Sequence, residues 1–411
     1  MSKKLLIHSL VFSPDGVSNA YLYNDIALKF KERGYDVVVL TSTPHYNVVE
    51  EQLKEQPLKW KVPGVYKVSS FHGIKVIHVP QKKFKSTVLR LFGFVYWHIV
   101  SFILGLSQKG VDVILSPSPP LTIGLINIWI AKIKRCKVVY NVQEIYPDIL
   151  NLKKGIVRSA LQKLERYIYR KSNCVTAIDR VFYDTIADRF DDPAKLRIIP
   201  NFVDTGLYNS EAGKRIKLDE HIFPRTEALK VVYAGNIGFA QDWDILIRLA
   251  QKTFSAEIEY YVIGDGVMKA VLEKRCKELK LTNIHILLYQ PRELMPAIIS
   301  YSDVQFIFMS PDMDKQGFPS KVYTILSCAK PLLVSSGENT PIVSFLKDLN
   351  CAKIETSEDI DDRVDDMAQW LTSVSRNTLK GMGLNGEQVI KTQYSKDIVT
   401  QQYVDLVDSL T

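Results

Sequence analysis

Three short glycine-containing segments stand where an expected strand gives way to an expected helix. They are residues 13–19 (SPDGVSN), 235–241 (GNIGFAQ) and 316–321 (QGFPSK). Free backbone N–H groups at a helix start attract phosphate, and glycine lets the backbone come close. None of the segments matches the G-x-G-x-x-G dinucleotide fingerprint, and a lone glycine usually makes only a tight turn. Three such segments at strand ends together indicate a phosphate-bearing ligand.

Lys321 adds a cation to the third segment. It follows Pro319 and Ser320, where a helix is expected to begin. An ammonium fixed there would neutralise a diphosphate leaving group together with the helix dipole. An exposed lysine with no catalytic role is the alternative that the residues alone leave open.

The order of the expected elements decides where these segments lie. The chain has 411 residues, and short apolar runs such as 36–41 and 137–142 alternate with longer helical stretches. Buried strands of this kind are typical of a parallel sheet covered on both faces. A polar stretch broken by proline and glycine, residues 200–226, reads as a linker before a second series that starts at Leu229.

The sequence therefore predicts an α/β protein with two doubly wound, Rossmann-like domains facing across a cleft. The first domain is expected at residues 1–200 and the second at 201–390. A terminal helix at 391–411 is expected to pack back towards the first domain. Ligands of open parallel sheets bind beyond the carboxyl ends of the strands, where the glycine segments are expected.

Longer segments resemble the family 4 retaining glycosyltransferases, which have the GT-B fold. In the second half these are 232–241 (VYAGNIGFAQ), 261–266 (YVIGDG), 302–309 (SDVQFIFM) and 316–331 (QGFPSKVYTILSCAKP). In the first half they are 141–149 (NVQEIYPDI) and 199–203 (IPNFV). The resemblance covers nearly the whole chain in the right order. It is greatest to the enzymes that add fucose- or fucosamine-type sugars to O-antigen and colanic-acid repeats.

The resemblance implies a set of residues that bind a nucleotide-sugar donor. They are Gly16, Gly235, Asn236, Gly238, Gly264, Asp265, Tyr289, Gln290, Gln316, Gly317, Phe318, Ser320 and Thr324. Both glutamates of the family's E-x7-E motif are replaced, by Gln316 and Thr324, which can hydrogen-bond but carry no charge. The basic pair of many members would fall near Asn236 and Ala240, where this chain has none. Lys321 and backbone amides are then the main stabilisers of the departing diphosphate.

Glu144 is the other catalytic candidate. The resemblance places it where the first domain approaches the acceptor, so it could orient or deprotonate the acceptor hydroxyl. The alternative is that Glu144 only anchors its loop together with Asp148.

The implied reaction is retaining transfer from a UDP- or GDP-sugar, with no cofactor and no metal. Asp312-x-Asp314 has the form of the D-x-D motif of the other glycosyltransferase fold, but its position in the second domain favours a surface loop. Five cysteines without C-x-x-C spacing predict no zinc site and fit a reducing compartment.

A basic segment leads into an apolar one between Val79 and Asp112, with no acidic residue between them. The residues expected to face a membrane are Lys82, Lys83, Lys85, Arg90, Phe92 and Trp97. The apolar run 91–106 is shorter than the roughly 20 residues that span a bilayer. Lysines beside aromatic side chains indicate peripheral contact with an anionic membrane, and a buried helix with a solvated basic lead-in is the alternative.

Location and partners follow from these features. Residues 1–10 do not form a signal peptide, so the chain is expected in the cytoplasm, peripheral on the inner face of the cytoplasmic membrane. No familiar nucleic-acid-binding module is present, so nucleic acid is not an expected partner. A membrane-facing first domain suits a lipid-linked saccharide acceptor in bacterial surface polysaccharide synthesis, a substrate that the family implies.

Two other functions fit the same architecture. A nucleotide-sugar 2-epimerase also closes two Rossmann domains over a donor, but it works on soluble substrates and gains nothing from a basic, aromatic segment. An inactive scaffold that binds nucleotide or membrane is consistent with the replaced acidic and basic pairs.

Overall fold

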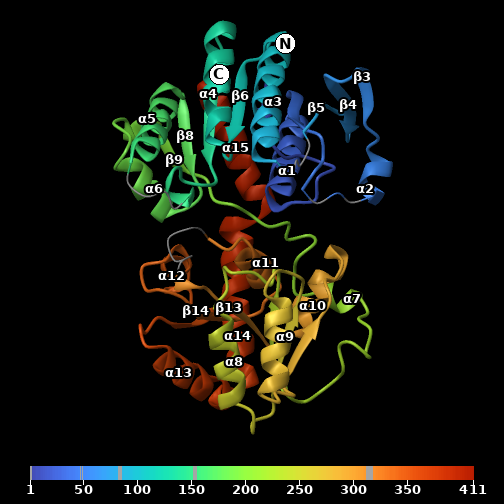
Figure 1. Cartoon of the computed structure of the whole chain (residues 1–411), viewed down its shortest axis with the longest axis vertical. Helices are drawn as coiled ribbons and strands as arrows, with labels where there is room; N and C mark the ends of the chain where they lie inside the picture. The colour runs from blue at the N-terminus through green and yellow to red at the C-terminus, as the bar shows by residue number, and fades with distance from the viewer. Residues whose placement is uncertain (1, 47, 49, 82–85, 151–154, 312–317) are drawn as a thin grey trace. The chain divides into compact units, whose positions relative to one another are not determined.

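The computed structural model describes all residues except 1, 47, 49, 82–85, 151–154 and 312–317. The chain forms two α/β units, each built around a largely parallel sheet, as predicted from the sequence (Figure 1). Unit 1 comprises Met1–Asn201 and Asp397–Thr411, and unit 2 comprises Phe202–Lys396. The first boundary lies one residue from the expected position and the second lies six residues later than expected.

Unit 1 contains a nine-stranded sheet with the order β3-β4-β5-β2-β1-β6-β7-β8-β9. The seven strands from β5 to β9 are parallel, whereas β3 and β4 form an antiparallel hairpin at one edge. In this order the strands span Lys59–Val62, Tyr66–Phe71, Ile74–Val79, Asp36–Ser42, Lys4–His8, Val113–Pro117, Lys137–Val142, Cys174–Ala177 and Leu196–Ile198. The parallel strands carry Val, Ile and Leu at successive positions because both of their faces are covered.

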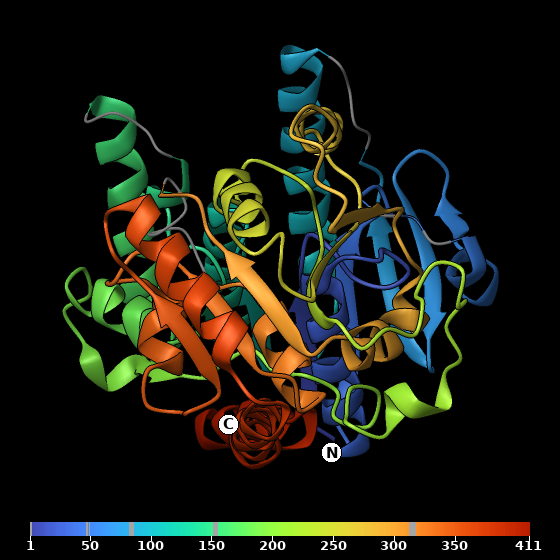
Figure 2. The ribbon, with the colours of Figure 1, turned by 90° about the horizontal axis from the view of Figure 1, so that it is seen from below.

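Helices cover both faces of this sheet. Figure 2 shows α1 (Ser18–Glu32) and α15 (Lys396–Leu410) on one side and α3 (Thr87–Ser107) on the other. α3 shares its apolar cluster with α4 (Leu121–Lys134). The remaining helices of the unit are α2 (Glu50–Glu55), α5 (Ile156–Lys171) and α6 (Arg180–Ala187).

The C-terminal helix completes unit 1 after the chain has passed through unit 2. The amide nitrogen of Asn141, at the end of β7, donates to the Tyr403 hydroxyl at 3.0 Å. The Tyr35 hydroxyl donates to Asp408 at 2.6 Å. Val399, Tyr403 and Val407 are buried, so α15 supplies part of the core of unit 1.

Unit 2 contains a six-stranded parallel sheet with the order β12-β11-β10-β13-β14-β15. These strands span Ile284–Leu287, Ile258–Ile263, Leu229–Ala234, Val304–Phe308, Leu332–Ser335 and Ala352–Glu355. The chain builds outwards from β10 to β12 and then returns to the other side of β10 with β13. The strand order therefore reverses between β10 and β13, and ligands of doubly wound sheets bind at such a point.

The helices of unit 2 pack on both faces. One apolar cluster involves α8 (Trp243–Lys252), α9 (Lys269–Glu278) and α13 (Ile360–Ser373). Another involves α10 (Met295–Tyr301), α11 (Lys321–Ser327) and α12 (Pro341–Leu346). α14 (Arg376–Val389) and a π-helical turn (Ile390–Tyr394) lead to α15.

The polar stretch 200–226 is not a free linker, contrary to the expectation from its composition. It contains a short helix, α7 (Ala212–Arg215), that packs against α10. At Gly213 a Cβ atom would lie 1.9 Å from the Ser300 hydroxyl oxygen, so only glycine allows this approach. Phe223 is buried in the same region. The segment is a packed part of unit 2.

Candidate functional site

The glycine loops of unit 2 meet at the carboxyl edge of its sheet. One loop follows β10 and the other follows β11, and the Ile237 amide donates to the Asp265 carbonyl oxygen at 2.8 Å. Gly264 has a φ of +153°, and a Cβ atom there would lie 1.9 Å from the carbonyl oxygen of Gly235. Glycine at position 264 is therefore required for the two loops to touch.

Two buried aromatic side chains hold the loop after β10 through hydrogen bonds from the protein interior. The Tyr233 hydroxyl donates to the Asn236 carbonyl oxygen at 2.7 Å, and the Trp243 indole nitrogen donates to the Gly238 carbonyl oxygen at 2.8 Å. Their rings pack edge to face at 5.3 Å. Because two carbonyl groups of the loop are bonded to the protein interior, its conformation is fixed before a ligand arrives. Neither aromatic residue was predicted from the sequence to support this loop.

Lys321 brings a cation to this loop from the start of α11. Its Nζ lies 3.8 Å from the centroid of the Tyr233 ring and 3.5 Å from the Ala234 carbonyl oxygen. Among the described residues no carboxylate pairs with it. Burial lowers the pKa of Lys321 to about 7, because an ammonium surrounded by protein loses its hydration. The site therefore holds a lysine that a bound anion would stabilise in its charged form.

The other predicted donor residues of unit 2 form three groups, and two of these groups follow strands β10 to β12. Asn236 and Gly238 belong to the loop after β10, and the Asp265 carboxylate accepts from the Gly266 amide at 2.9 Å. Tyr289 and Gln290 follow β12, two strands away from β10, and the Tyr289 side chain is 66% exposed. Neither residue contacts the glycine loops through a hydrogen bond that the described part of the chain shows.

The residues around the start of α11 differ in their surroundings. Phe318 packs against the rings of Tyr323 and Phe345, at 5.0 and 5.1 Å, and so belongs to an apolar cluster. The Thr324 hydroxyl donates to the Lys321 carbonyl oxygen at 2.8 Å, and Ser320 is exposed. The predicted residues Gln316 and Gly317, and the pair Asp312 and Asp314, lie outside the described residues.

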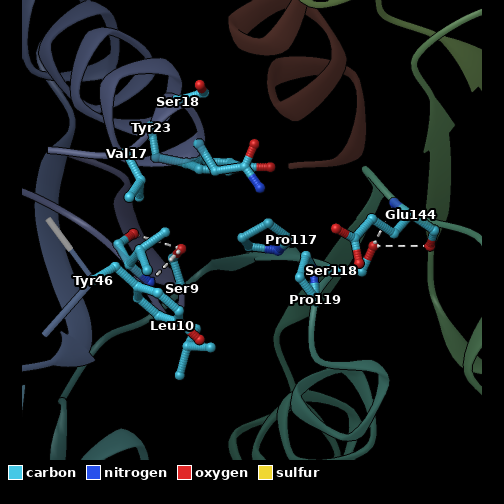
Figure 3. Close-up of a pocket in the computed structure, with 12 residues that line it drawn as sticks. Ser9, Leu10, Val17, Ser18, Tyr23, Tyr46, Pro117, Ser118, Pro119 and Glu144 are labelled. Atoms are coloured by element: carbon cyan, nitrogen blue, oxygen red, sulfur yellow. Dashed lines mark hydrogen bonds between the residues drawn. The ribbon is translucent and has the colours of Figure 1, made fainter. Parts of the chain in front are cut away.

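Unit 1 contains a cavity of about 420 Å³ at the carboxyl ends of its own strands (Figure 3). Its wall includes residues that follow β1 and β6, the start of α1, Tyr46 and Glu144. Asp15 accepts from the amides of His45 and Tyr46, each at 3.1 Å, and this fixes the segment that carries Tyr46. Gly16 precedes the lining residues Val17 and Ser18 and belongs to unit 1, not to the glycine loops of unit 2.

Glu144 faces this cavity beside Ser118, as Figure 3 shows. The Ser118 hydroxyl accepts from the Glu144 amide and donates to its carbonyl oxygen, both at 3.3 Å. The carboxyl group of Glu144 makes no hydrogen bond within the described part of the chain. Burial raises the pKa of Glu144, which favours a group that can take up a proton.

The side chain that anchors this loop is that of Asp148 and not that of Glu144. Asp148 forms ion pairs with Arg189 and, at 3.0 Å, with Arg158. Arg189 also pairs with the buried Glu165 at 3.1 Å and donates to the Tyr146 carbonyl oxygen at 3.3 Å. The loop is therefore held without the carboxylate of Glu144, which leaves that group available to a ligand.

The residues predicted to face a membrane do not all lie on one surface. Phe92 is 68% exposed on α3, and Arg90 is exposed next to it. Trp97 is 0% exposed, and its ring packs 5.3 Å from that of His8, so its prediction as a membrane contact is wrong. An aromatic residue in a helix that is apolar on all sides can face either way, and Trp97 faces the sheet. Lys82, Lys83 and Lys85 lie outside the described residues.

The length of α3 also differs from the expectation. The helix has 21 residues, and by length and composition alone it could cross a membrane, with 28% of its most apolar window buried. The apolar run 91–106 is therefore part of a longer helix, and length alone does not exclude a span. α3 nevertheless packs Trp97, Val100 and Leu104 into the core of unit 1. Within the described residues no group of three His, Cys, Asp or Glu side chains could hold a metal ion.

Comparisons with known proteins agree with this architecture. The model of Glycosyltransferase Family 4 matches residues 21–207, and that of Glycosyl transferases group 1 matches residues 215–389. The chain is therefore a GT-B glycosyltransferase of family 4.

Its relatives include WcaI of Escherichia coli (strain K12), whose name describes a colanic acid biosynthesis glycosyl transferase. The two are 21% identical over 349 residues, which cover 82% of this chain and 84% of WcaI. Similar solved structures include Anabaena HepE in complex with UDP and glucose, with a TM-score of 0.72 and 13% identity over 99% of this chain and 100% of HepE. WaaG, a glycosyltransferase involved in lipopolysaccharide biosynthesis, gives a TM-score of 0.66 and 13% identity over 98% of this chain and 99% of WaaG.

Proposed function

We propose that the protein transfers a sugar, with retention of configuration, from a UDP- or GDP-sugar to a lipid-linked saccharide in the synthesis of a bacterial surface polysaccharide. The observation that carries this proposal is the meeting of Lys321 with the loops of Gly235 and Gly264 where the strand order of unit 2 reverses. WcaI and WaaG, by their names, act in colanic acid and lipopolysaccharide biosynthesis, which supports a polysaccharide product.

The donor diphosphate is stabilised by groups that the protein holds in place. The glycine loops offer backbone amides at the sheet edge, and Lys321 offers an ammonium with no carboxylate partner among the described residues. Charge that develops on the departing diphosphate is best stabilised by donors that need no rearrangement. This arrangement requires no metal ion, in line with the reaction that the family resemblance implies. The same resemblance makes fucose- and fucosamine-type donors the first to test.

The acceptor enters the cavity of unit 1. Tyr23, Tyr46, Pro117 and Pro119 give this cavity flat apolar surfaces on which a sugar ring can stack, and Glu144 adds one carboxyl group. Glu144 accepts a hydrogen bond from the acceptor hydroxyl and orients it for attack. The raised pKa of Glu144 suits the uptake of the hydroxyl proton.

The outer face of α3 lies on the membrane surface. It exposes apolar side chains spaced three and four residues apart, which places them along one side of the helix: Val88, Phe92, Val95, Ile99 and Ile103. Leu89, Leu91 and Tyr96 on α3, and Trp129 and Ile133 on α4, extend this surface. Exposed apolar side chains gathered on one helix face are typical of surfaces that contact a membrane or another protein.

The composition of residues 56–111, which include β3, β4 and α3, favours an anionic bilayer as the partner. Residues 56–111 contain nine lysines and arginines and no aspartate or glutamate. The β3–β4 hairpin carries Lys59 and Lys61 beside the exposed Trp60, and it is joined to α3 by the Tyr96 hydroxyl, which donates to the Gly64 carbonyl oxygen at 2.7 Å. Basic side chains next to apolar and aromatic ones are typical of proteins that lie on anionic lipid.

Nucleotide release from a panel of UDP-, GDP- and dTDP-sugars tests the proposal. The panel includes GDP-fucose and UDP-N-acetylfucosamine, and each donor is assayed with and without bacterial lipid extract. We expect release from one donor that depends on the extract, and a lipid product whose new bond keeps the donor's anomeric configuration by NMR. Inversion would overturn the retaining assignment. Extract-independent conversion of the donor sugar would indicate an epimerase instead.

A further inference from the structure

Tyr233 is a core residue whose ring also contacts a lysine ammonium, that of Lys321. It belongs to the apolar core of unit 2, near the end of β10, with an exposed fraction of 3%, and its ring packs against Trp243 and Phe308 at 5.3 and 5.1 Å. One face of the ring is covered by the Lys321 ammonium at 3.8 Å from the centroid. A cation within about 6 Å of an aromatic centroid is attracted by the negative ring face. Tyr233 therefore contacts the cation of the donor site and, through its hydroxyl, the loop at Asn236.

The immediate surroundings of Lys321 leave few other ways to hold its charge. The described contacts give Nζ one carbonyl oxygen, that of Ala234 at 3.5 Å, which is a long hydrogen bond. Gly235 keeps the space beside it open, because a Cβ atom there would lie 3.3 Å from the Tyr233 hydroxyl oxygen and 3.4 Å from Nζ. The ring, the glycine and the lysine therefore fit together as one unit.

We propose that Tyr233 is a positioning residue that places the Lys321 ammonium against the diphosphate of the donor through its ring face. A ring holds a cation without neutralising it, whereas a carboxylate would pair with Lys321 and compete with the ligand. The charge that the lysine carries is therefore left available to the incoming phosphates. The hydroxyl group has the separate task of fixing the loop at Asn236. This inference rests on the proposed function because it assumes that the donor carries a diphosphate.

The test compares the binding of UDP, GDP and dTDP with the binding of their nucleosides by calorimetry. In Tyr233→Leu we expect the preference for the diphosphate over its nucleoside to fall about tenfold, with nucleoside affinity kept within about twofold. Tyr233→Phe keeps the ring face and loses only the hydrogen bond to Asn236, so it should keep more of the preference than Tyr233→Leu, and the difference between the two variants measures the ring face. In the background of Lys321→Met, Tyr233→Phe and Tyr233→Leu should show the same preference, because the ring then has no cation to hold.

Tyr260→Leu is the matched control. Tyr260 is a fully buried tyrosine of the same core whose hydroxyl bonds to Thr253 at 2.8 Å, away from Lys321. The control should lower the melting temperature without changing the preference for the diphosphate. An unchanged preference in a folded Tyr233→Leu, or an equal loss for nucleoside and diphosphate, would overturn the proposal.

A second series does not depend on the folding of Tyr233→Leu. Phenylalanine with one, two or three ring fluorines at position 233 keeps the shape of the side chain while it weakens the negative ring face. Diphosphate affinity should fall with each fluorine, and a flat series would contradict the ring-face contact. If the wild-type protein binds none of the three diphosphates, the proposed function fails and this inference with it. If it binds one and the series is flat, only this inference fails.

Discussion

Lys321 and Glu144 are both ionisable groups whose pKa values are shifted by burial, in the direction that favours the neutral form. The pKa of Lys321 is lowered to about 7, and that of Glu144 is raised. Each group lies at the carboxyl edge of a sheet. A ligand bound there can stabilise the charged form, which burial has made less favourable. Groups with shifted pKa values concentrate at functional sites, although structural ion pairs shift them as well.

The pH dependence of nucleotide diphosphate affinity follows from the pKa of Lys321. Below pH 7 the free protein already carries the ammonium that the diphosphate needs, so affinity stays constant with respect to this group. Above pH 7 binding must take up a proton, and affinity should fall by at most about tenfold per pH unit. Calorimetry between pH 6 and pH 9 measures this slope, with Lys321→Met as the control. The Lys321→Met variant should bind more weakly and show no slope of this origin; the same slope in both would assign it to another group.

Loss of the Lys321 ammonium should also slow the reaction itself. Lys321→Ala removes the cation that opposes charge on the departing diphosphate, and turnover should fall by roughly two to three orders of magnitude. Steady-state kinetics with the identified donor measure the effect. Near-normal turnover would remove Lys321 from the mechanism.

Glu144→Gln should distinguish a role in transfer to the acceptor from a role in binding the donor. The amide keeps the size of the side chain but cannot accept a proton, so transfer should fall by roughly 10²–10⁴-fold while donor binding is kept. Because the loop is anchored by Asp148 and Arg189, the variant should unfold at the wild-type temperature. Equal losses in transfer and donor affinity would instead indicate a structural role.

The residues that line the donor site were easier to predict from the sequence than the side chains that hold those residues in place. Gly235 and Lys321 were predicted because a glycine after a strand and a lysine at a helix start leave local patterns, whereas Gly264 was predicted only from the family resemblance. The support from Tyr233 and Trp243 was not predictable, because both look like ordinary core residues and their partners are backbone carbonyls of a loop. The sequence also did not show that Trp97 faces the sheet, because α3 has no polar stripe that would distinguish its outer face from its inner face.

At the level of elements, buried parallel strands were predictable and exposed ones were not. Residues 137–142 and 229–234 each contain two adjacent valines that are buried, and this apolar pattern is typical of a strand. β3 (Lys59–Val62) is exposed at every position and carries alternating lysines, which resembles a loop in sequence. Residues 200–226 were predicted to be a linker because their composition is polar, yet they pack against α10.

The outer face of α3 gives the prediction at this level. Phe92→Glu with Ile99→Glu places two charges on the exposed apolar side, and binding to vesicles of equal parts phosphatidylglycerol and phosphatidylethanolamine should fall more than about tenfold. Flotation at fixed ionic strength measures the bound fraction. Phe254→Glu with Leu384→Glu changes two exposed apolar residues of unit 2 and should have no effect. Equal binding of both double variants and the wild type would exclude this face as the membrane surface.

At the level of the whole molecule, the net charge of +8 is unevenly distributed, because residues 56–111 contribute nine positive charges and no negative ones. The rest of the chain is therefore close to neutral. A charge concentrated on one region gives orientation as well as attraction, since it selects which surface meets an anionic bilayer.

The division of the chain also has a stability consequence. Tyr403→Phe removes the hydroxyl that receives the Asn141 amide in unit 1, and the free energy of unfolding should fall by about 1–3 kcal/mol. Chemical denaturation followed by Trp fluorescence measures it. Donor binding to unit 2 should be unchanged, and an unchanged unfolding free energy would show that the contact adds nothing to unit 1.

Because α15 belongs to unit 1, it constrains the order in which the two units can fold during translation. The first 201 residues emerge early, yet the helix that covers part of their sheet is translated last, after all of unit 2. Nascent unit 1 must therefore wait with the buried surface of Tyr23 and Asn141 incomplete, whereas unit 2 can fold as soon as its own segment is out. Unit 1 is therefore begun first and completed last, because its fold includes residues 397–411.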